Sequence, residues 1–206
     1  MKKLSCGKMG MFRRIIGCVL ASVLMVLGGC GGDLKYTKTT PEAKNFHPKA
    51  IGILPVEVGI NTEAKGVIDK VIADDLTKRR WLEKVVASSA IQDELSKDEE
   101  LGKALAAYVS KLMTVSFSDP DLASKMGSSL RVDALLISNL DFWEYTTHGE
   151  DKVARVGLGM TLVEANTGAV IWNARHEIQE KYRWWRPELV KVAKKIVDQM
   201  VDRMPH

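Results

Sequence analysis

Residues 153–180 read VARVGLGMTLVEANTGAVIWNARHEIQE, and this stretch decides the fold. From Val153 to Glu164, apolar residues alternate with Arg, Gly and Thr, which is the pattern of a β-strand with one buried face. Residues 164–168, Glu-Ala-Asn-Thr-Gly, have the composition of a turn, and the alternation resumes from Ala169 to Glu180. The segment therefore predicts a β-hairpin.

The segments on either side of this hairpin predict a third strand and a helix. Residues 132–145 are rich in strand-forming side chains, and we expect them to pair with the hairpin. After the hairpin, Pro187 is suited to the start of a helix. The apolar side of that helix carries Leu189, Val192, Ile196, Val197 and Met200 at helical spacing.

Two further strands are predicted in the first half of the chain. Residues 50–56, AIGILPV, form a short apolar run that is typical of a buried strand. A helix is expected after Asn61, which can cap it, and residues 81–87 have the character of a second short strand.

The region from Ser88 onward predicts helices. A capping box of Ser96 and Glu99 restarts the first of them, and a shorter helix starts at Pro120 and ends at Gly127. Taken together, the elements predict an α/β (α+β) fold, with a mixed sheet of about five strands, a C-terminal β-hairpin and helices packed on the sheet.

The first residues have the composition of an export signal. Five Lys and Arg and no acid precede an apolar run over residues 15–27, which small residues and Cys30 follow. The run is 13 residues long, whereas a helix needs roughly 20 residues to cross a bilayer. We therefore expect residues 1–29 to be a lipoprotein signal peptide that is removed. Met9 and Met11 leave alternative starts open.

Leu27-Gly28-Gly29-Cys30 resembles the lipobox of bacterial lipoproteins, in which the cysteine accepts the lipid and becomes the first residue. This resemblance implies that Cys30 is the lipid attachment site and carries palmitate-type acyl chains. Two acyl chains suffice for stable anchoring. A plain secretory signal cleaved beside a cysteine is the alternative. In enterobacteria, an Asp directly after the lipidated cysteine keeps a lipoprotein in the inner membrane. This chain has Gly31 at that position, which favours the outer membrane, with the domain in the periplasm.

The charge and the cysteine content of the chain differ before and after Cys30. Five of the 30 Lys and Arg precede Cys30, which leaves 25 against all 26 Asp and Glu and a formal charge of about −1. No basic excess remains, so we expect no nucleic-acid partner. Cys6 and Cys18 lie in the signal, and the exported domain therefore has no further thiol for a disulfide.

Two segments are expected after the signal. Residues 30–48 are polar and turn-rich, and they predict a flexible tether from the lipidated Cys30. Residues 49–206 are enough for a single α/β domain with its own core.

Three pieces of the chain carry a resemblance to a known superfamily: the strand ending Ile53-Leu54-Pro55, the segment VDALLI at residues 132–137, and the hairpin LVEANTGAVIW at residues 162–172. Their order and content resemble lipoproteins of the CsgG, LpoB and TolB amino-terminal-like superfamily, including small neisserial surface lipoproteins. The resemblance spans roughly residues 48–203. It implies an α/β domain that works by assembly or by contact with a partner.

No motif predicts a catalyst, a metal site or a cofactor. Gly157-Leu158-Gly159 lacks the third glycine of a dinucleotide fingerprint and lies within a strand. Small residues there are expected to let a helix or a neighbouring subunit approach closely. The four histidines lack the spacing of helical metal ligands.

One cluster stands apart from the regular pattern, namely Tyr182, Arg183, Trp184, Trp185 and Arg186 between the last strand and the last helix. Aromatic residues with Arg are favoured at the centres of protein interfaces and at membrane surfaces. Three interpretations stay open: aromatics that cap the core, contact with a partner or subunit, and contact with lipid. Phe142, Trp143 and Tyr145 can join any of these arrangements.

Two functions follow as hypotheses. The first is a membrane-anchored envelope lipoprotein that is not an enzyme and acts by assembly or by binding an envelope protein. The second is an enzyme or small-ligand binder that acts on envelope or peptidoglycan substrates. A pocket with converging titratable groups would favour the second.

Overall fold

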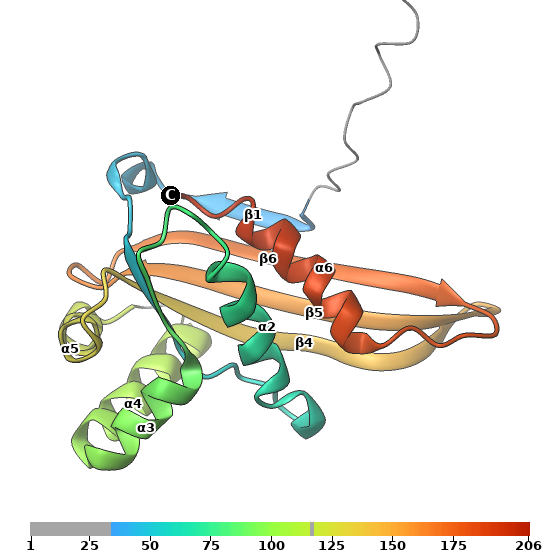
Figure 1. Ribbon diagram of the computed structural model, residues 1–206, viewed down its shortest axis with the longest axis horizontal. Coiled ribbons are helices and arrows are strands. Elements are labelled where there is room, and N and C mark those ends of the chain that lie inside the picture. Colours follow the sequence, from blue (N-terminus) through green and yellow to red (C-terminus); the bar gives the residue numbers. More distant parts are fainter. Residues whose placement is uncertain (1–33, 116–117) are drawn as a thin grey trace, which may run out of the picture. The chain divides into compact units, whose positions relative to one another are not determined.

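A mixed sheet forms the centre of the domain in the computed structural model, which describes residues 34–115 and 118–206 (Figure 1). Its six strands lie in the order β1-β6-β5-β4-β2-β3. The strands are β1 (Tyr36–Thr39), β2 (Ala50–Ile53), β3 (Lys84–Val86), β4 (Ala134–His148), β5 (Asp151–Glu164) and β6 (Val170–Tyr182). The α-helices are α2 (Val67–Leu76), α3 (Ser88–Lys97), α4 (Glu99–Val115), α5 (Pro120–Leu130) and α6 (Leu189–Val201). Two 3₁₀ turns, η1 (Pro41–Asn45) and η2 (Thr62–Ala64), complete the described elements.

The three longest strands are consecutive in the chain and antiparallel. β4 pairs with β5 from Ala134 opposite Glu164 to His148 opposite Asp151, and β5 pairs with β6 along most of its length. Gly149, in the turn between β4 and β5, has a φ of 63°, which glycine adopts without strain. The predicted hairpin and its pairing with the preceding strand are therefore confirmed. β2 adds parallel pairs with β3 and β4, so the sheet is mixed.

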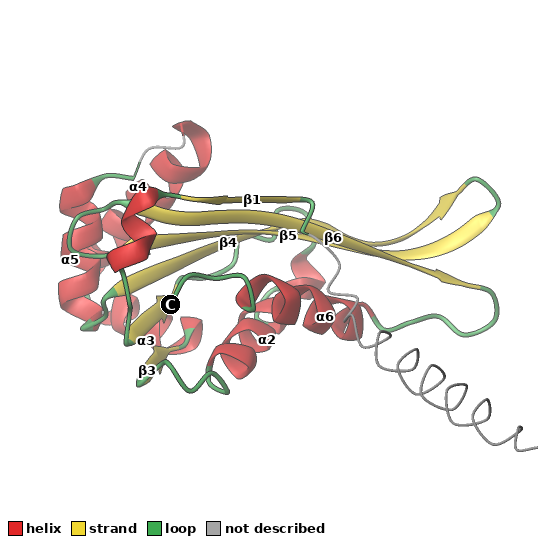
Figure 2. Ribbon diagram, turned by 90° about the horizontal axis from the view of Figure 1, so that it is seen from above, coloured by secondary structure: helices red, strands yellow, loops and turns green. Residues whose placement is uncertain are grey.

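Helices cover the two faces of the sheet unequally. α2 and α6 pack on one face, where alternate residues of β5 such as Val156, Leu158 and Met160 join their core. α3, α4 and α5 pack on the other face at one end only, against residues such as Leu135 and Val163. Figure 2 shows α4 and α5 at that end, while α6 lies against the opposite face. The expected α+β class is confirmed. α3, α4 and α5 leave the rest of the second face uncovered.

The sixth strand was not expected, because β1 falls within the predicted tether. It pairs with β6 from Tyr36 opposite Arg175 to Thr39 opposite Trp172. The indole Nε1 of Trp172 donates a hydrogen bond of 3.1 Å to the hydroxyl of Thr37. All four residues of β1 are exposed, so no alternation of apolar and polar residues marks it as a strand. The expected tether over residues 30–48 thus differs from the structure at β1 and η1.

Three predicted helix boundaries were wrong. α2 begins at Val67, after Gly66, whereas Asn61 precedes the 3₁₀ turn η2. α4 begins after Asp98, whose Oδ1 accepts a hydrogen bond from the backbone N–H of Leu101, so Asp98 caps the helix instead of Ser96. α5 continues through Gly127 and ends at Leu130, and the residue that follows it, Arg131, has a φ of 54°. A Cβ on Gly127 would lie 2.4 Å from the Cβ of Ala165, so this glycine allows the helix to approach the end of β5.

Candidate interaction site

The part of the sheet that α3–α5 leave uncovered is polar. β5 contributes Gly157 and Gly159 to this open face, and side chains of β4 fill the space beside both glycines. A Cβ on Gly157 would lie 2.7 Å from Cδ2 of Phe142, and one on Gly159 would lie 2.4 Å from Oδ1 of Asn139. The expectation that small residues admit a helix or a subunit was therefore wrong, because side chains of β4 occupy that space.

An ion-pair network crosses the open face. The carboxylate of Glu177 accepts hydrogen bonds from Arg155 at 2.8 Å and Lys35 at 2.6 Å, and its side chain is only 8% exposed. Arg155 also pairs with Glu144 at 3.3 Å and lies over the ring of Phe142. Burial alone would raise the pKa of Glu177, but hydrogen bonds from Arg155 and Lys35 outweigh it and lower the pKa to about 2. The network joins β4, β5 and β6 to Lys35, which directly precedes β1.

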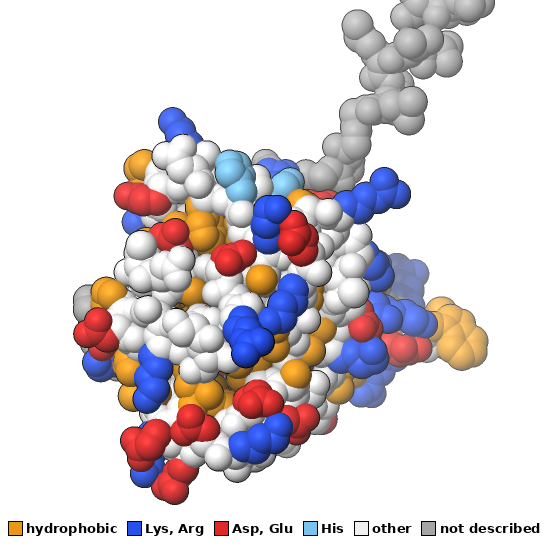
Figure 3. All heavy atoms as spheres, turned by 60° about the vertical axis from the view of Figure 1, so that its left-hand side comes forward, with side chains coloured by type: hydrophobic (Ala, Val, Ile, Leu, Met, Phe, Trp, Pro, Cys, Tyr) orange, Lys and Arg blue, Asp and Glu red, His pale blue; other side chains and the backbone are white. Residues whose placement is uncertain are grey.

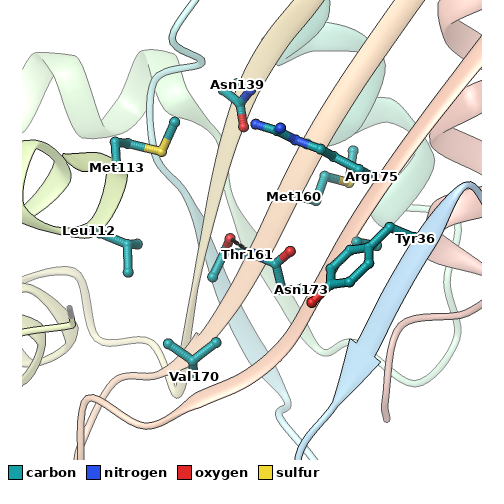
Figure 4. A pocket seen from close by; sticks show the side chains of 11 residues that line it. Tyr36, Leu112, Met113, Asn139, Met160, Thr161, Val170, Asn173 and Arg175 are labelled. Atoms are coloured by element: carbon teal, nitrogen blue, oxygen red, sulfur yellow. Dashed lines mark hydrogen bonds between the residues drawn. The ribbon is translucent and has the colours of Figure 1, made fainter. Parts of the chain in front are cut away.

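A pocket of about 450 Å³ lies where the open face meets α4 (Figure 4). Its sheet side carries amides, and Asn173 Nδ2 donates a hydrogen bond of 2.7 Å to the hydroxyl of Thr161. Leu112 and Met113 of α4 form an apolar wall. Arg175 is the charged residue among its lining side chains, and neither a carboxylate nor a cysteine lines it. Such a pocket can accept polar groups, but it lacks a pair of groups for acid–base or nucleophilic catalysis.

The three long strands extend beyond their neighbours on both sides. β1 pairs with β6 only between Trp172 and Arg175, so His176–Tyr182 has no strand on its outer side among the described residues. β2 pairs with β4 only up to Leu136, and Glu57 adds a single bridge at Asn139. Phe142–His148 likewise has no outer strand in the described part of the chain. We call these two seven-residue stretches the free edges.

The aromatic and arginine cluster forms the start of the connection between β6 and α6. Tyr182 lies edge-on to Tyr145 with ring centroids 6.1 Å apart, and the guanidinium of Arg186 stacks 3.7 Å from the centroid of the same ring. Trp184 and Trp185, in contrast, are 90% and 91% exposed. The interpretation that the aromatics cap the core therefore holds for Tyr182 and is wrong for the two tryptophans. We call residues 183–186 the tryptophan loop.

Charges around the tryptophan loop are unequally neutralised. Lys181 pairs with Asp151 at 2.6 Å, and its hydrogen bond, together with the nearby positive charge of Arg183, lowers the pKa of Asp151. Arg183 and Arg186 have no acid within ion-pair distance among the described residues. The loop therefore presents two indoles together with two cations that no carboxylate of the described residues pairs within ion-pair distance.

Cys30, the histidines and any membrane-spanning helix were the remaining features that the sequence analysis considered. Cys30 and the signal peptide lie outside the described residues. His176 is a buried sheet residue whose Nε2 lies 2.8 Å from Oε1 of Gln199 on α6. Within residues 34–115 and 118–206, no three His, Cys, Asp or Glu are grouped to hold a metal ion. None of the helices in those ranges has the length and hydropathy needed to cross a membrane. On the surface in Figure 3, Lys and Arg are interspersed with Asp and Glu.

Comparison with known proteins supports the fold. Neither protein-family models nor curated proteins give a match. Among solved structures, the PelC dodecamer from Paraburkholderia phytofirmans has a TM-score of 0.51 at 15% identity, over 81% of this chain and 92% of that chain. Lipoprotein GNA1162 from Neisseria meningitidis has a TM-score of 0.50 at 14% identity, over 76% and 100% of the two chains.

The expected resemblance to lipoproteins is thus supported at the level of fold, since GNA1162 is a lipoprotein with this architecture. The LpoB C-terminal domain from Salmonella enterica reaches a TM-score of 0.33 at 13% identity, over 64% of this chain and 83% of that chain. That value is too low to support membership of the wider superfamily.

Proposed function

We propose that the mature protein is a non-enzymatic lipoprotein of the cell envelope, which is anchored through Cys30 and assembles with further copies of itself. In this proposal the anchor lies in the outer membrane and the domain in the periplasm. The lipobox at the end of an export signal supports the anchor. The fold that the domain shares with lipoprotein GNA1162 agrees with it.

The two free edges support the proposed self-assembly. Unpaired strand edges expose rows of backbone N–H and C=O groups, which can hydrogen-bond to a strand of another chain. Phe142–His148 and His176–Tyr182 are equal in length and lie on opposite sides of the same three strands. We infer that the β4 edge of one copy pairs with the β6 edge of the next.

Head-to-tail contacts of this kind close into a ring when the rotation between copies is suitable. PelC, which has the same fold, is described as a dodecamer. We therefore infer that a second copy of this chain, and not a different envelope protein, pairs with each free edge.

The pocket supports a non-enzymatic role over the enzymatic alternative. It carries amide, hydroxyl and arginine side chains, and no carboxylate or thiol faces it. A catalyst of peptidoglycan or glycan hydrolysis needs a pair of carboxylates, or a nucleophile with its base. The near-neutral charge after Cys30 also argues against nucleic acid as a partner.

Disulfide trapping in the full-length lipidated protein tests the assembly, because no cysteine follows Cys30. Thr146 on the β4 edge and Gln179 on the β6 edge lie on the same open face. Chains with Thr146→Cys, coexpressed with chains carrying Gln179→Cys, should form disulfide dimers. Ile60→Cys, at a side chain that is 94% exposed elsewhere, is the matched control.

The combination of variants that forms dimers shows which edges are in contact. Dimers in the mixture, above the level seen with Ile60→Cys, would support head-to-tail pairing. Dimers from either single variant alone would indicate a two-fold contact and overturn the pairing of β4 with β6. Trapping of a different protein, with no dimer of this chain, would replace self-assembly by partner binding.

A further inference from the structure

The tryptophan loop exposes aromatic surface that nothing in the described residues covers. Trp184 and Trp185 are 90% and 91% exposed, whereas Trp143 and Trp172 of the same chain are buried. An indole has an apolar body and a polar N–H, and tryptophan is enriched at the boundary between lipid and water for that reason. We propose that Trp184 and Trp185 insert into the headgroup layer of the membrane that holds Cys30. This inference rests on the lipid anchor of the proposed function.

The loop is held in place at both ends, which suits it to such a contact. Tyr182 and Arg186 both contact the ring of Tyr145, and the hydroxyl of Tyr145 donates to the backbone carbonyl of Pro187. These contacts fix the two ends of the loop, so less backbone freedom is lost when the tryptophans meet a surface.

The N-terminal end of β1 points toward the end of the domain that carries the tryptophan loop. β1 runs antiparallel to β6, with Tyr36 opposite Arg175, so the chain before Tyr36 is directed toward Tyr182. Lys35 already follows this course, since its backbone N–H lies 3.3 Å from Nδ1 of His176 and its ammonium pairs with Glu177.

The length of chain between Cys30 and β1 is sufficient for the lipid and the tryptophan loop to reach the same membrane surface. The six steps from Cys30 to Tyr36 can span at most about 20 Å. Along β6, the seven steps from Arg175 to Tyr182 cover about 23 Å. The difference is smaller than the interfacial layer of one leaflet, which is about 5–8 Å thick. The lipid on Cys30 and the tryptophan loop can therefore reach one headgroup layer together.

The charge of the loop favours lipid with anionic phosphate headgroups. Arg183 and Arg186 have no acid within ion-pair distance in the described part of the chain, whereas the neighbouring acids Glu180 and Glu188 are paired with lysines. Cations beside a membrane surface are attracted to anionic headgroups. A protein partner that used the same loop would need a carboxylate to pair with these arginines.

Quenching of tryptophan fluorescence by brominated lipid tests the contact. The full-length lipidated protein is reconstituted in vesicles of phosphatidylethanolamine and phosphatidylglycerol with brominated acyl chains, and flotation first establishes that it is bound. We expect the vesicles to quench part of the fluorescence, and Trp184→Phe with Trp185→Phe to remove most of that quenching. Trp81→Phe, in a half-buried tryptophan outside the loop, is the matched control and should leave the quenching unchanged.

Absence of quenching in the floating wild-type protein, or equal quenching in the double variant, would overturn the inference. Protection of the tryptophans from brominated lipid, together with loss of the assembly in the double variant, would assign the loop to a protein contact instead. A protein that fails to float would show that the lipid anchor fails, whereas the disulfide test addresses assembly separately.

Discussion

The phenol hydroxyl of Tyr145 donates a hydrogen bond of 2.7 Å to the backbone carbonyl of Pro187, 42 residues later in the chain. This bond joins β4 to the start of α6. Tyr145→Phe keeps the ring and removes the bond, so we expect the free energy of unfolding to fall by about 1 kcal/mol, as measured by urea denaturation. Tyr36→Phe, at a half-exposed tyrosine on β1, should change it by less than about 0.5 kcal/mol. Equal losses in the two variants would mean that the bond does not stabilise the loop.

Gly159→Ala is expected to destabilise the domain. The new methyl group would lie 2.4 Å from Oδ1 of Asn139, and we expect a loss of about 1–3 kcal/mol, since overpacking forces neighbours out of place. Asn139→Ala in the same chain removes the obstructing amide and should recover most of that loss. Thermal unfolding of the two single variants and the double variant measures the coupling. Additive effects would contradict the contact.

Glu177 predicts a dependence of stability on pH. Its folded pKa of about 2 lies below the ordinary value of 4.5. Its contribution to stability is therefore complete above pH 4.5 and is lost as the pH falls toward 2. Glu177→Gln should cost about 2 kcal/mol at neutral pH, because bonds from charged donors are lost. It should also flatten this part of the pH profile, and denaturation at several pH values would reveal an unchanged slope if the assignment is wrong.

Arg79 links α2 to α6. It pairs with Asp75 at 2.7 Å and Asp198 at 3.1 Å, and also contacts Asp202. The arginine is 21% exposed and Asp75 14%, so Arg79→Ala should cost about 1–3 kcal/mol in urea denaturation. Lys70→Ala breaks a pair with Asp74 that is largely exposed and should cost less than about 0.5 kcal/mol. A reversal of this order would contradict the view that the partly buried pair contributes more.

The regular part of the fold could be predicted because burial leaves a periodic pattern. The alternation in β5 and β6 and the helical spacing in α6 follow from one face of each element lying in the core. β1 carries no such pattern, because all four of its residues are exposed and backbone pairing with β6 holds it. An edge strand of this kind is recognised only when its partner is in place.

The candidate site was predictable in composition but not in arrangement. The aromatic and arginine cluster stands out in the sequence, yet only the contacts of Tyr145 explain why Tyr182 packs inward while Trp184 and Trp185 face solvent. The network at Glu177 joins residues from three strands and Lys35, and no local spacing reveals it. The space over Gly157 could not be assigned either, since Phe142 fills it from the neighbouring strand.

Native mass spectrometry of the full-length protein, extracted from membranes in mild detergent, tests the central claim most directly. It reports both the mass of each chain and the number of chains in the particle. We expect particles with several copies, in which each chain begins at Cys30 and carries acyl chains on that residue. Single chains at every concentration, or chains that keep residues 1–29 with an unmodified Cys30, would contradict the account.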